Sequence, residues 1–369
     1  MRILLTGGGT AGHINPALAI ANHICEKEPD SQVLFVGTRN GLETNLVPRA
    51  GYDIEYIKIH GFARSLTPQN IKNLAEIPIA IHAASRIIKK FRPDVVVGTG
   101  GYVSGPVLYA ASKKNIPTLV HESNAFPGIT TRILSGYVDK VALGVEDARK
   151  YLKNDNNVIL TGTPLMSSLL EKDRMSARIE LGLDDRPFIV AFGGSLGAKN
   201  FNKTVAEWMC QVAGKNKYQI LMGTGKNNQY DDVLNQFKEY GFDIANQPDI
   251  KVCEYIYNMD TVMSAADLII SRAGASTLCE LTALGKPAIL VPSPYVTGNH
   301  QEHNARAIEK GGGAVVILEK DFLCEKLNET VYSLTKNKDV LLNMQKNSAK
   351  MGHIDALDVL YNEIKSLIK

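Results

Sequence analysis

Two glycine-rich turns, about half a chain apart, have the residue types of a phosphate-binding site. Each follows a short apolar segment and precedes a helical pattern: residues 6–13 read Thr-Gly-Gly-Gly-Thr-Ala-Gly-His, and residues 193–199 read Gly-Gly-Ser-Leu-Gly-Ala-Lys. Glycines that lead a strand into a helix leave backbone N–H groups free, and the positive end of the helix dipole points at the same spot. Two such turns predict two similar α/β domains, each facing a phosphorylated ligand.

The first turn also fits the dinucleotide-binding fingerprint, in which a carboxylate about 20 residues further on holds a ribose. Here the second apolar segment, residues 33–36, is followed by Gly37 and Thr38 instead of an acidic residue, and His13 stands directly behind the last glycine. Both departures disfavour a nicotinamide or flavin cofactor. A purely structural role, in which glycines allow close packing of strand and helix, explains one such turn more readily than two.

Four further motifs follow apolar segments of strand length. They are Gly-Thr-Gly-Gly-Tyr-Val-Ser-Gly-Pro at 98–106, His-Glu-Ser-Asn at 121–124, Ser-Arg-Ala-Gly-Ala-Ser-Thr at 271–277 and Asn-His-Gln at 299–301. Open α/β sheets bind ligands outside the carboxyl ends of their strands, so each motif is expected on the ligand-binding rim of its sheet. We expect the rims of the two domains to face each other across a cleft.

The elements that position these motifs alternate between apolar strands and helices. Near-continuous apolar runs recur at residues 33–36, 95–97, 118–120, 141–143, 189–192, 220–222, 268–270 and 288–291. Such runs between helical patterns are typical of parallel sheets covered on both faces, so the predicted fold class is α/β, with two Rossmann-like, doubly wound sheets. The expected N-terminal domain is 1–163, the C-terminal domain is 164–345, and an amphipathic helix within 346–369 is expected to pack back on the N-terminal domain.

Composition excludes several classes of function. The 369 residues are 44% hydrophobic and 21% charged, which suffices for two ordinary cores. A net charge of +3, with no basic block interleaved with aromatics, gives no sign of nucleic acid binding. The five cysteines are scattered without a C-x-x-C spacing, which fits a reducing cytoplasm and indicates neither a disulfide framework nor a zinc site. With no leader and no apolar run of about 18 residues, we expect neither export nor a membrane span.

The ordered motifs resemble those of the inverting glycosyltransferases of the GT-B fold, and among them the N-acetylglucosaminyltransferases that complete lipid II in peptidoglycan synthesis. The matching positions, which extend over essentially the whole chain, are 8–13, 100–106, 121–124, 193–198 and 271–277. The resemblance implies transfer of N-acetylglucosamine from UDP-N-acetylglucosamine to the 4-hydroxyl of the muramoyl sugar in undecaprenyl-diphosphate-linked MurNAc-pentapeptide (lipid I), with inversion. It implies no cofactor, although magnesium stimulation stays open.

By this resemblance the C-terminal domain binds the donor. The diphosphate is expected near Ser195, the uracil at the backbone of Ile256, the ribose hydroxyls at Glu280 and the sugar at Gln301. A carboxylate suits vicinal hydroxyls, and a neutral amide both donates and accepts hydrogen bonds. The other implied donor contacts are Lys199 and Ala275 in this domain, and Thr10, Ala11, Gly12 and Asn124 in the N-terminal domain.

The N-terminal domain is then expected to hold the acceptor, with its diphosphate near the loop 7–12 or the loop 98–106. The residues assigned to it are Gly8, Gly9, Gly100, Gly101, Tyr102 and Ser104. The attacking 4-hydroxyl needs a base. His13 is the first candidate, Glu122 is the rival and His121 is a supporting residue, while a purely structural role for His13 in orienting the glycine loop stays equally open.

The leaving diphosphate needs charge neutralisation, and no Asp-x-Asp triplet occurs that would hold a metal. Helix dipoles and cations such as Lys199 are therefore assigned this role. Three positions depart from the family pattern: Ser123 replaces a glutamine, Thr163 an asparagine and Met166 an arginine. Because a thioether carries no charge, we expect Lys199 to compensate for Met166.

Residues 70–92 combine apolar and basic side chains in a helical pattern, which Pro78 is expected to interrupt. The apolar ones are Ile71, Leu74, Ile77, Ile79, Ile81, Ile87, Ile88 and Phe91, and the basic ones are Lys72, Arg86, Lys89, Lys90 and Arg92. Composition alone fits a core helix with a solvated face. A lipid-linked acceptor instead favours peripheral attachment to anionic lipid on the cytoplasmic side of the cell membrane.

Two other classes of function stay open at this point. One is a different UDP-sugar enzyme of the same fold, such as a UDP-N-acetylglucosamine 2-epimerase, and the other is a non-catalytic protein that binds nucleotide sugars. Proteins of cell-wall synthesis and cell division are further partners that the resemblance implies.

Overall fold

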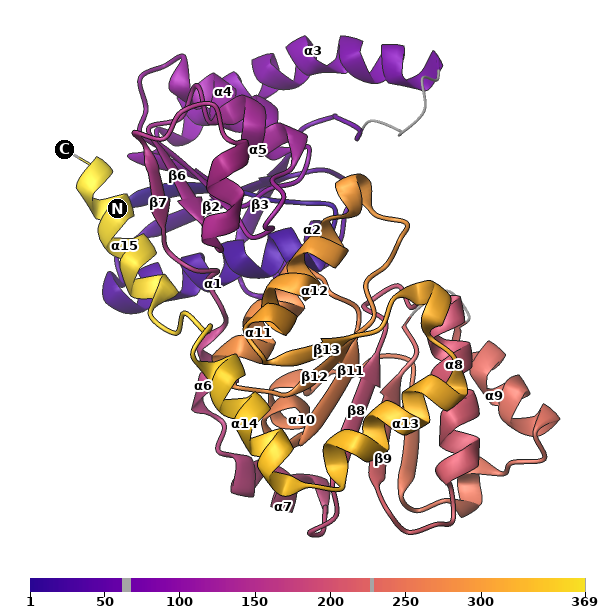
Figure 1. The fold of residues 1–369 in the computed structure, drawn as a ribbon. Helices are drawn as coiled ribbons and strands as arrows, with labels where there is room; N and C mark the ends of the chain where they lie inside the picture. Colours follow the sequence, from indigo (N-terminus) through magenta and orange to yellow (C-terminus); the bar gives the residue numbers. More distant parts are fainter. Residues whose placement is uncertain (62–67, 226–228, 369) are drawn as a thin grey trace. The chain divides into compact units, whose positions relative to one another are not determined.

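The computed structural model describes residues 1–61, 68–225 and 229–368. It forms two compact units: unit 1 comprises Met1–Met166 and His353–Lys369, and unit 2 comprises Ser167–Gly352. In each unit, helices cover both faces of one sheet, as Figure 1 shows. The limits at 163 and 345 that the sequence suggested lie close to these, but the second falls inside the continuous helix α14 (Lys338–Ala349).

Unit 1 is built on a seven-stranded sheet in the order β3-β2-β1-β4-β5-β6-β7, and every recorded strand pair is parallel. The strands are β1 (Arg2–Thr6), β2 (Gln32–Gly37), β3 (Asp53–Tyr56), β4 (Val95–Gly98), β5 (Thr118–Glu122), β6 (Lys140–Leu143) and β7 (Val158–Leu160). The strand order reverses direction between β1 and β4, which is the point where open α/β sheets bind ligands. The glycine-rich loops that follow these two strands therefore lie at the switch point.

The helices of unit 1 form its two outer layers. They are α1 (Ala11–Lys27), α2 (Glu43–Arg49), α3 (Pro68–Phe91), α4 (Ser104–Ser112), α5 (Ile129–Leu134), the 3₁₀ helix η1 (Glu146–Tyr151) and α15 (Ala356–Leu367). Helix α3 is continuous through Pro78, so the expected interruption there is wrong. A proline deletes one backbone hydrogen bond and often kinks a helix, but packing against neighbours can hold the helix together around it.

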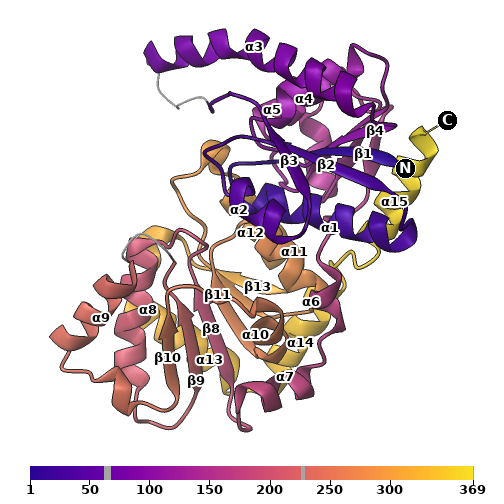
Figure 2. The ribbon, with the colours of Figure 1, turned by 180° about the vertical axis from the view of Figure 1, so that it is seen from behind.

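The C-terminal helix α15 packs on unit 1, beside α1 (Figure 2). Leu360 and Ile364 are fully buried in the same apolar cluster as the β1 side chains Ile3 and Leu5. At its edge, Lys365 Nζ and Tyr361 Oη donate hydrogen bonds of 2.6 and 2.8 Å to Glu28, and the bond from Lys365 is the main cause that lowers the pKa of Glu28 to about 2. The end of the chain thus completes the core in which its beginning lies.

Unit 2 is built on a six-stranded parallel sheet in the order β10-β9-β8-β11-β12-β13. The strands are β8 (Phe188–Phe192), β9 (Gln219–Gly223), β10 (Ile250–Cys253), β11 (Leu268–Ser271), β12 (Ala288–Leu290) and β13 (Ala314–Val316). The switch point lies between β8 and β11, where the second glycine-rich turn and the 271–277 motif begin. Both units are doubly wound, and the predicted fold class is confirmed.

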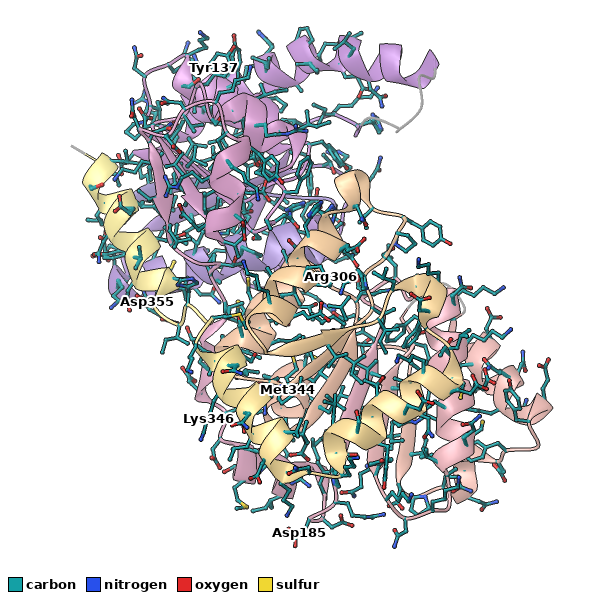
Figure 3. The ribbon with its side chains drawn as sticks, in the orientation of Figure 1. Tyr137, Asp185, Arg306, Met344, Lys346 and Asp355 are labelled. Carbon is teal, nitrogen blue, oxygen red and sulfur yellow. The ribbon has the colours of Figure 1, made fainter. Side chains whose placement is uncertain are left out.

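The helices of unit 2 cover its sheet in the same way. They are α6 (Ser167–Glu171), α7 (Arg174–Leu181), α8 (Lys199–Val212), α9 (Gln229–Glu239), α10 (Met259–Ala265), α11 (Ala275–Ala283), α12 (His300–Lys310), α13 (Cys324–Thr335) and α14, with the 3₁₀ helices η2 (Ile244–Asn246), η3 (Thr297–Asn299) and η4 (Glu319–Asp321). Met344 of α14 is buried in the core that includes Trp208, whereas Lys346, two residues on, is exposed, which illustrates how each helix divides its faces (Figure 3).

Candidate active site

The first glycine-rich turn leads from β1 to α1 and is interlocked with the loop after β4. A Cβ atom at Gly7 would lie 2.2 Å from Thr99 Oγ1, and one at Gly101 would lie 2.4 Å from the Gly8 carbonyl oxygen. Gly9 and Gly101 have φ values of +87° and +80°, which side chains rarely adopt. Only glycine lets the two loops approach this closely, so the turn and the 98–106 motif form one framework.

A buried carboxylate that the sequence did not single out supports this framework. Glu43, in the first turn of α2, is fully buried and accepts hydrogen bonds from Gly9 N (3.0 Å), Thr38 N (2.9 Å) and Thr38 Oγ1 (2.8 Å). A Cβ at Gly8 or Gly37 would lie 2.6 Å from its side chain. Glu43 thus fills the space between the glycine turn and the end of β2, where a dinucleotide-binding fold holds a ribose.

His13 lies where the two loops meet. Its Nδ1 atom is 3.2 Å from the Thr99 carbonyl oxygen, and Thr99 Oγ1 donates a 2.6 Å hydrogen bond to the His13 carbonyl. Because a carbonyl oxygen only accepts, Nδ1 carries the proton and Nε2 is the basic nitrogen of the neutral ring. A Cβ at Gly100 would lie 2.5 Å from Nδ1, so the ring rests directly on the backbone of the second loop.

The residues predicted to bind the acceptor diphosphate divide into two groups. Gly8, Gly100 and Ser104 are buried, and Ser104 Oγ donates a 2.6 Å hydrogen bond to the Gly100 carbonyl, so these three hold the loops together. Gly9, Gly101 and Tyr102 are partly exposed. The N–H of Gly9 is already used by Glu43, and the Tyr102 ring lies 3.5 Å from where a Gly9 Cβ would be.

The His-Glu-Ser-Asn motif at the end of β5 is largely internal. His121 is fully buried, donates from Nε2 to the Gly162 carbonyl at 3.0 Å, and has its pKa lowered by burial, so it is a neutral structural group. Glu122 accepts from Asn124 N (3.0 Å) and Asn124 Nδ2 (2.9 Å) with one oxygen and from Gly128 N (2.9 Å) with the other. Its carboxylate therefore shapes the loop that carries Asn124.

The second glycine-rich turn, between β8 and α8, is held at its base and open at its tip. A Cβ at Gly197 would lie 2.3 Å from the Thr224 carbonyl, which also accepts a 2.8 Å hydrogen bond from Asn202 Nδ2. At Gly194, with φ of +96°, a Cβ would meet no described atom within 4 Å. Among the described residues no side chain caps the start of α8, which leaves its first N–H groups without a side-chain acceptor, and Lys199 in this first turn is exposed.

Glu280 lies on α11 in unit 2, on the helix that follows the 271–277 motif. Within the described parts of the chain its carboxylate has no hydrogen-bonding or ionic partner, and burial raises its pKa to about 7. Gly274 begins the helix without a side-chain cap, so the N–H groups around Ala275 are available to a ligand. An unpaired carboxylate can accept hydrogen bonds from the vicinal hydroxyls of a ligand.

Two further residues assigned to the donor are positioned by their neighbours. Ile256 is buried after β10, and a Cβ at Gly223 would lie 3.1 Å from its side chain. Gln301, in the first turn of α12, accepts a 2.9 Å hydrogen bond from Ser293 N through its amide oxygen. That bond orients the side chain and leaves the amide N–H₂ group to donate elsewhere.

Arg272 has a structural role that the sequence did not reveal. It is buried at the end of β11, where Nη1 donates to the Val291 carbonyl at 3.1 Å and pairs with Glu319. Its guanidinium also lies 5.5 Å from the centre of the Phe201 ring. These contacts connect the ends of β11 and β12 with α8. Arg272 thus holds the carboxyl ends of these two strands in place.

The three positions that depart from the family pattern lie in unit 1. Ser123 Oγ is 3.5 Å from His121 Nδ1, and Thr163 Oγ1 is buried without a hydrogen-bond partner among the described atoms. Met166 packs partly buried against the apolar cluster that contains Leu360. The thioether thus makes an apolar contact where an arginine would place a charge.

The helix expected to contact a membrane is only partly free. Ile77, Ile81, Ile87, Ile88 and Phe91 of α3 pack on the core of unit 1. Both α3 and α5, which pack on α4, nevertheless carry exposed apolar side chains: they are Leu74, Ile79, Ile129 and Ile133, and each is at least 56% exposed. The side chains of Ile71 and Lys72 lie outside those that are described.

Two further findings concern membranes and metals. Over the residues described, no helix combines the length and apolarity needed to cross a bilayer. Nor do three His, Cys, Asp or Glu side chains come together in those residues in a way that would hold a metal ion. All five cysteines are free thiols.

Comparisons with known proteins agree with the geometry of both units. Residues 3–143 match the glycosyltransferase family 28 N-terminal domain, and residues 188–360 match the C-terminal domain of the same family. Two curated relatives are both named UDP-N-acetylglucosamine–N-acetylmuramyl-(pentapeptide) pyrophosphoryl-undecaprenol N-acetylglucosamine transferase. The protein of Acetivibrio thermocellus is 47% identical over 100% of this chain and 99% of its own length. That of Ruminiclostridium cellulolyticum is 48% identical over 100% of both.

A solved structure gives the same result at the level of the fold. The crystal structure of Acinetobacter baumannii MurG superimposes with a TM-score of 0.75 and 27% identity, covering 99% of each chain. The resemblance drawn from the ordered motifs is confirmed, and so is the GT-B architecture.

Proposed function

The chain belongs to glycosyltransferase family 28, and we propose that it moves N-acetylglucosamine from UDP-N-acetylglucosamine to lipid-linked N-acetylmuramyl-pentapeptide, giving lipid II. It is an N-acetylglucosamine transferase by this membership, since relatives that carry the activity in their names match it at 47–48% identity over its full length. The acceptor is the undecaprenyl-diphosphate-linked sugar named in those relatives.

The observation that carries the donor assignment is that unit 2 holds both an unpaired carboxylate, that of Glu280 within the described residues, and a glycine-rich turn with an open tip. Vicinal ribose hydroxyls satisfy such a carboxylate, and the start of α8 offers N–H groups and Lys199 to a diphosphate. Gln301 has a free amide N–H₂ group for the sugar. These groups together fit a nucleoside diphosphate sugar.

For the base, the contacts favour His13 over Glu122. The hydrogen bond between His13 and Thr99 leaves Nε2 as the basic nitrogen, which suits removal of a proton from the attacking 4-hydroxyl. Both carboxylate oxygens of Glu122 already accept hydrogen bonds from its own loop. In one displacement the acceptor oxygen bonds to the anomeric carbon, the bond to UDP breaks, and the configuration inverts.

The departing UDP accumulates negative charge. The N-terminus of α8 and the ammonium group of Lys199 can stabilise that charge, with the N-terminus of α11 contributing a second helix dipole. Thr10, Ala11, Gly12 and Asn124 stay predicted donor contacts from unit 1.

A lipid-linked acceptor requires that the protein reach a membrane surface. The exposed apolar side chains of α3 and α5, with Lys89 and Lys90 near the end of α3, support peripheral attachment to an anionic leaflet on the cytoplasmic side. Most of the apolar face of α3 is core, so the attachment rests on a small set of side chains.

Release of UDP from UDP-N-acetylglucosamine, with and without a soluble lipid I analogue, tests the proposal. We expect release only in the presence of the analogue, together with a β-linked disaccharide product. Formation of N-acetylmannosamine without acceptor would instead identify an epimerase. Tight binding of UDP-N-acetylglucosamine with no UDP release in any acceptor mixture would identify a non-catalytic binding protein.

A further inference from the structure

A hollow in unit 1 lies at the carboxyl ends of β2 and β3, apart from the residues assigned to the substrates. It has a volume of about 390 Å³, and its lining includes the buried residues Ile57 and Ile59. Three basic residues also line it: Arg39, Lys58 and His60. Volumes of this size occur at the lower end of the range for small-ligand sites.

The basic groups of this hollow, which we call the Arg39 pocket, differ in whether an acidic side chain pairs with them. Glu76 of α3 contacts two of them, since Lys58 Nζ lies 3.7 Å and His60 Nδ1 2.7 Å from its carboxylate oxygens. Arg39 lies over the ring of Tyr56, 5.1 Å from its centre, and within the described residues no carboxylate pairs with it. Stacking on a ring orients the guanidinium and leaves its N–H edge free to bind an oxyanion with two parallel hydrogen bonds.

The Arg39 pocket is joined to the glycine turn of the same unit by one side chain. Thr38, which lines the pocket, donates its N–H and its hydroxyl to Glu43, and the other oxygen of Glu43 accepts from Gly9 N. A single carboxyl group thus spans the distance from the pocket wall to the turn. Whatever binds at the turn therefore has the pocket as its immediate neighbour.

We propose that the Arg39 pocket receives the peptide of the acceptor and that Arg39 pairs with one of its carboxylates. This inference rests on the proposed function, which makes a lipid-linked muramoyl-pentapeptide the acceptor. A lining that joins apolar residues with one unpaired, oriented guanidinium suits the end of a peptide, which carries a single carboxylate. A diphosphate, which carries more charge, needs several free donors and fits this lining less well.

Two soluble acceptors with a short lipid chain test the proposal: one with free peptide carboxylates, and one with the same carboxylates converted to primary amides. For Arg39→Ala we expect the KM of the free-carboxylate acceptor to rise about tenfold, the loss of one charge-assisted pair. The kcat and the donor KM should stay within about twofold. With the amidated acceptor, the parent chain and the variant should share the same raised KM.

The matched control is Arg49→Ala, which removes an exposed arginine of unit 1 that does not line the pocket. It should leave both acceptor constants unchanged. An unaltered acceptor KM in Arg39→Ala would overturn the proposal, and so would an equal rise with both acceptors, because Arg39 would then contact the diphosphate or a lipid surface. If the parent chain transfers sugar to neither acceptor, the proposed function itself fails, and the peptide assignment fails with it.

Discussion

The two glycine-rich turns of this chain share one strand-to-helix design but differ in what surrounds them. In unit 1 the turn after β1 is filled from within: Glu43 accepts from Gly9 N, and the backbone at Gly101 lies against Gly8. In unit 2 the tip of the turn after β8 is open, since a Cβ at Gly194 would meet no described atom within 4 Å. A glycine motif therefore indicates close approach of the backbone, and only its surroundings show whether protein or ligand makes that approach.

Two glutamates show the same contrast. Glu43 is fully buried and accepts three hydrogen bonds, so folding satisfies it. Glu280 has no partner in the described chain, and its burial raises its pKa to about 7. A carboxylate left unpaired at such a cost is typical of a ligand-binding position. In unit 1 a carboxylate of the protein itself fills the space beside the glycine-rich turn, whereas the unpaired Glu280 of unit 2 is consistent with the proposed binding of the donor there.

The largest expected effect tests whether unit 1 supplies the chemistry. We expect His13→Ala to lower kcat by about 100-fold or more, because general-base assistance is worth that much. Binding of UDP, which we assign to unit 2, should change little, and His13→Asn should not restore turnover. Steady-state kinetics and UDP titration measure both. Near-normal turnover in the purified variant would transfer the role of base to Glu122.

The next prediction concerns the two glutamates as a pair. Glu43→Gln places an amide N–H₂ group against backbone and hydroxyl donors in a buried space, and we expect it to destabilise the protein by about 2 kcal/mol. Glu280→Gln should instead stabilise the folded protein at pH 8. Because the folded pKa of Glu280 is about 7 against a usual value of 4.5, its ionised form costs stability above pH 7, and that cost disappears as the pH falls toward 4.5.

Thermal unfolding of the parent chain and both variants at pH 8 and pH 5 measures this difference. Glu280→Gln should unfold at a higher temperature than the parent at pH 8 and close to it at pH 5. If Glu43→Gln is as stable as the parent, the carboxylate is not what holds the turn of unit 1. Glu43 would then not be a structural counterpart to Glu280.

Donor binding gives the next effect. Removing the carboxylate that we assign to the ribose hydroxyls should raise the KM for UDP-N-acetylglucosamine at least about tenfold in Glu280→Ala, with acceptor saturation barely changed. In the parent chain the donor should bind more tightly as the pH rises from 6 to 8, since Glu280 ionises near pH 7. That pH dependence should be absent from Glu280→Gln. An unchanged donor KM would remove Glu280 from the site.

Most of this fold could be predicted from the sequence because central parallel strands read as apolar runs. Apart from β1, which was expected as the apolar segment before the first glycine-rich turn, the strands that the runs at residues 33–36 to 288–291 did not include are β3, β7, β10 and β13, and each of them is an edge strand of its sheet. Edge strands are partly exposed, so polar residues such as Asp53 and Glu55 interrupt the apolar pattern. The pattern therefore identifies the middle of a sheet better than its margins.

The site was less predictable, and the reason is the partner of each polar group. Glu43 has the sequence context of an ordinary acid in the first turn of a helix, and nothing local indicates that it reaches back to Gly9. Ser104 was assigned to the acceptor diphosphate and Glu122 was the rival candidate for the base, yet the polar atoms of both side chains bond to their own loops. Motifs locate the ligand-binding rim of a sheet. Which of their donors and acceptors remain free depends on hydrogen bonds that form on folding, within one loop at Ser104 and Glu122 and between distant residues at Glu43 and Gly9.

A smaller effect is expected for membrane binding, where substitutions of lysines in unit 1 should weaken binding to vesicles and matched substitutions in unit 2 should not. Neutralising Lys89 and Lys90 in unit 1, as glutamines, should reduce sedimentation with anionic vesicles several-fold, since each basic residue near such a surface contributes about 1 kcal/mol. Salt should reduce binding of the parent in the same way. The matched change in unit 2 replaces the exposed Lys346 and Lys350 and should have no effect. Equal losses in both variants would show that net charge, and not a face of unit 1, governs attachment.

The smallest effect tests whether a cation of unit 2 compensates for a missing cation of unit 1. Met166 packs against the apolar cluster of unit 1, and an arginine there could keep its aliphatic stem in that contact while extending its charge outward. We expect Lys199→Ala to weaken UDP binding about fivefold, and Met166→Arg to tighten it only about twofold in the parent chain, but to restore much of the loss in Lys199→Ala. Lys203→Ala, one helical turn further along α8 at an exposed position, is the control and should leave UDP affinity unchanged.

A double-mutant cycle in UDP affinity measures the coupling between positions 166 and 199, which should exceed the scatter of about 0.5 kcal/mol expected for independent sites. Strict additivity would mean that Lys199 is no substitute for the family arginine, and weaker UDP binding in Met166→Arg alone would show that position 166 does not serve the donor phosphates in this chain.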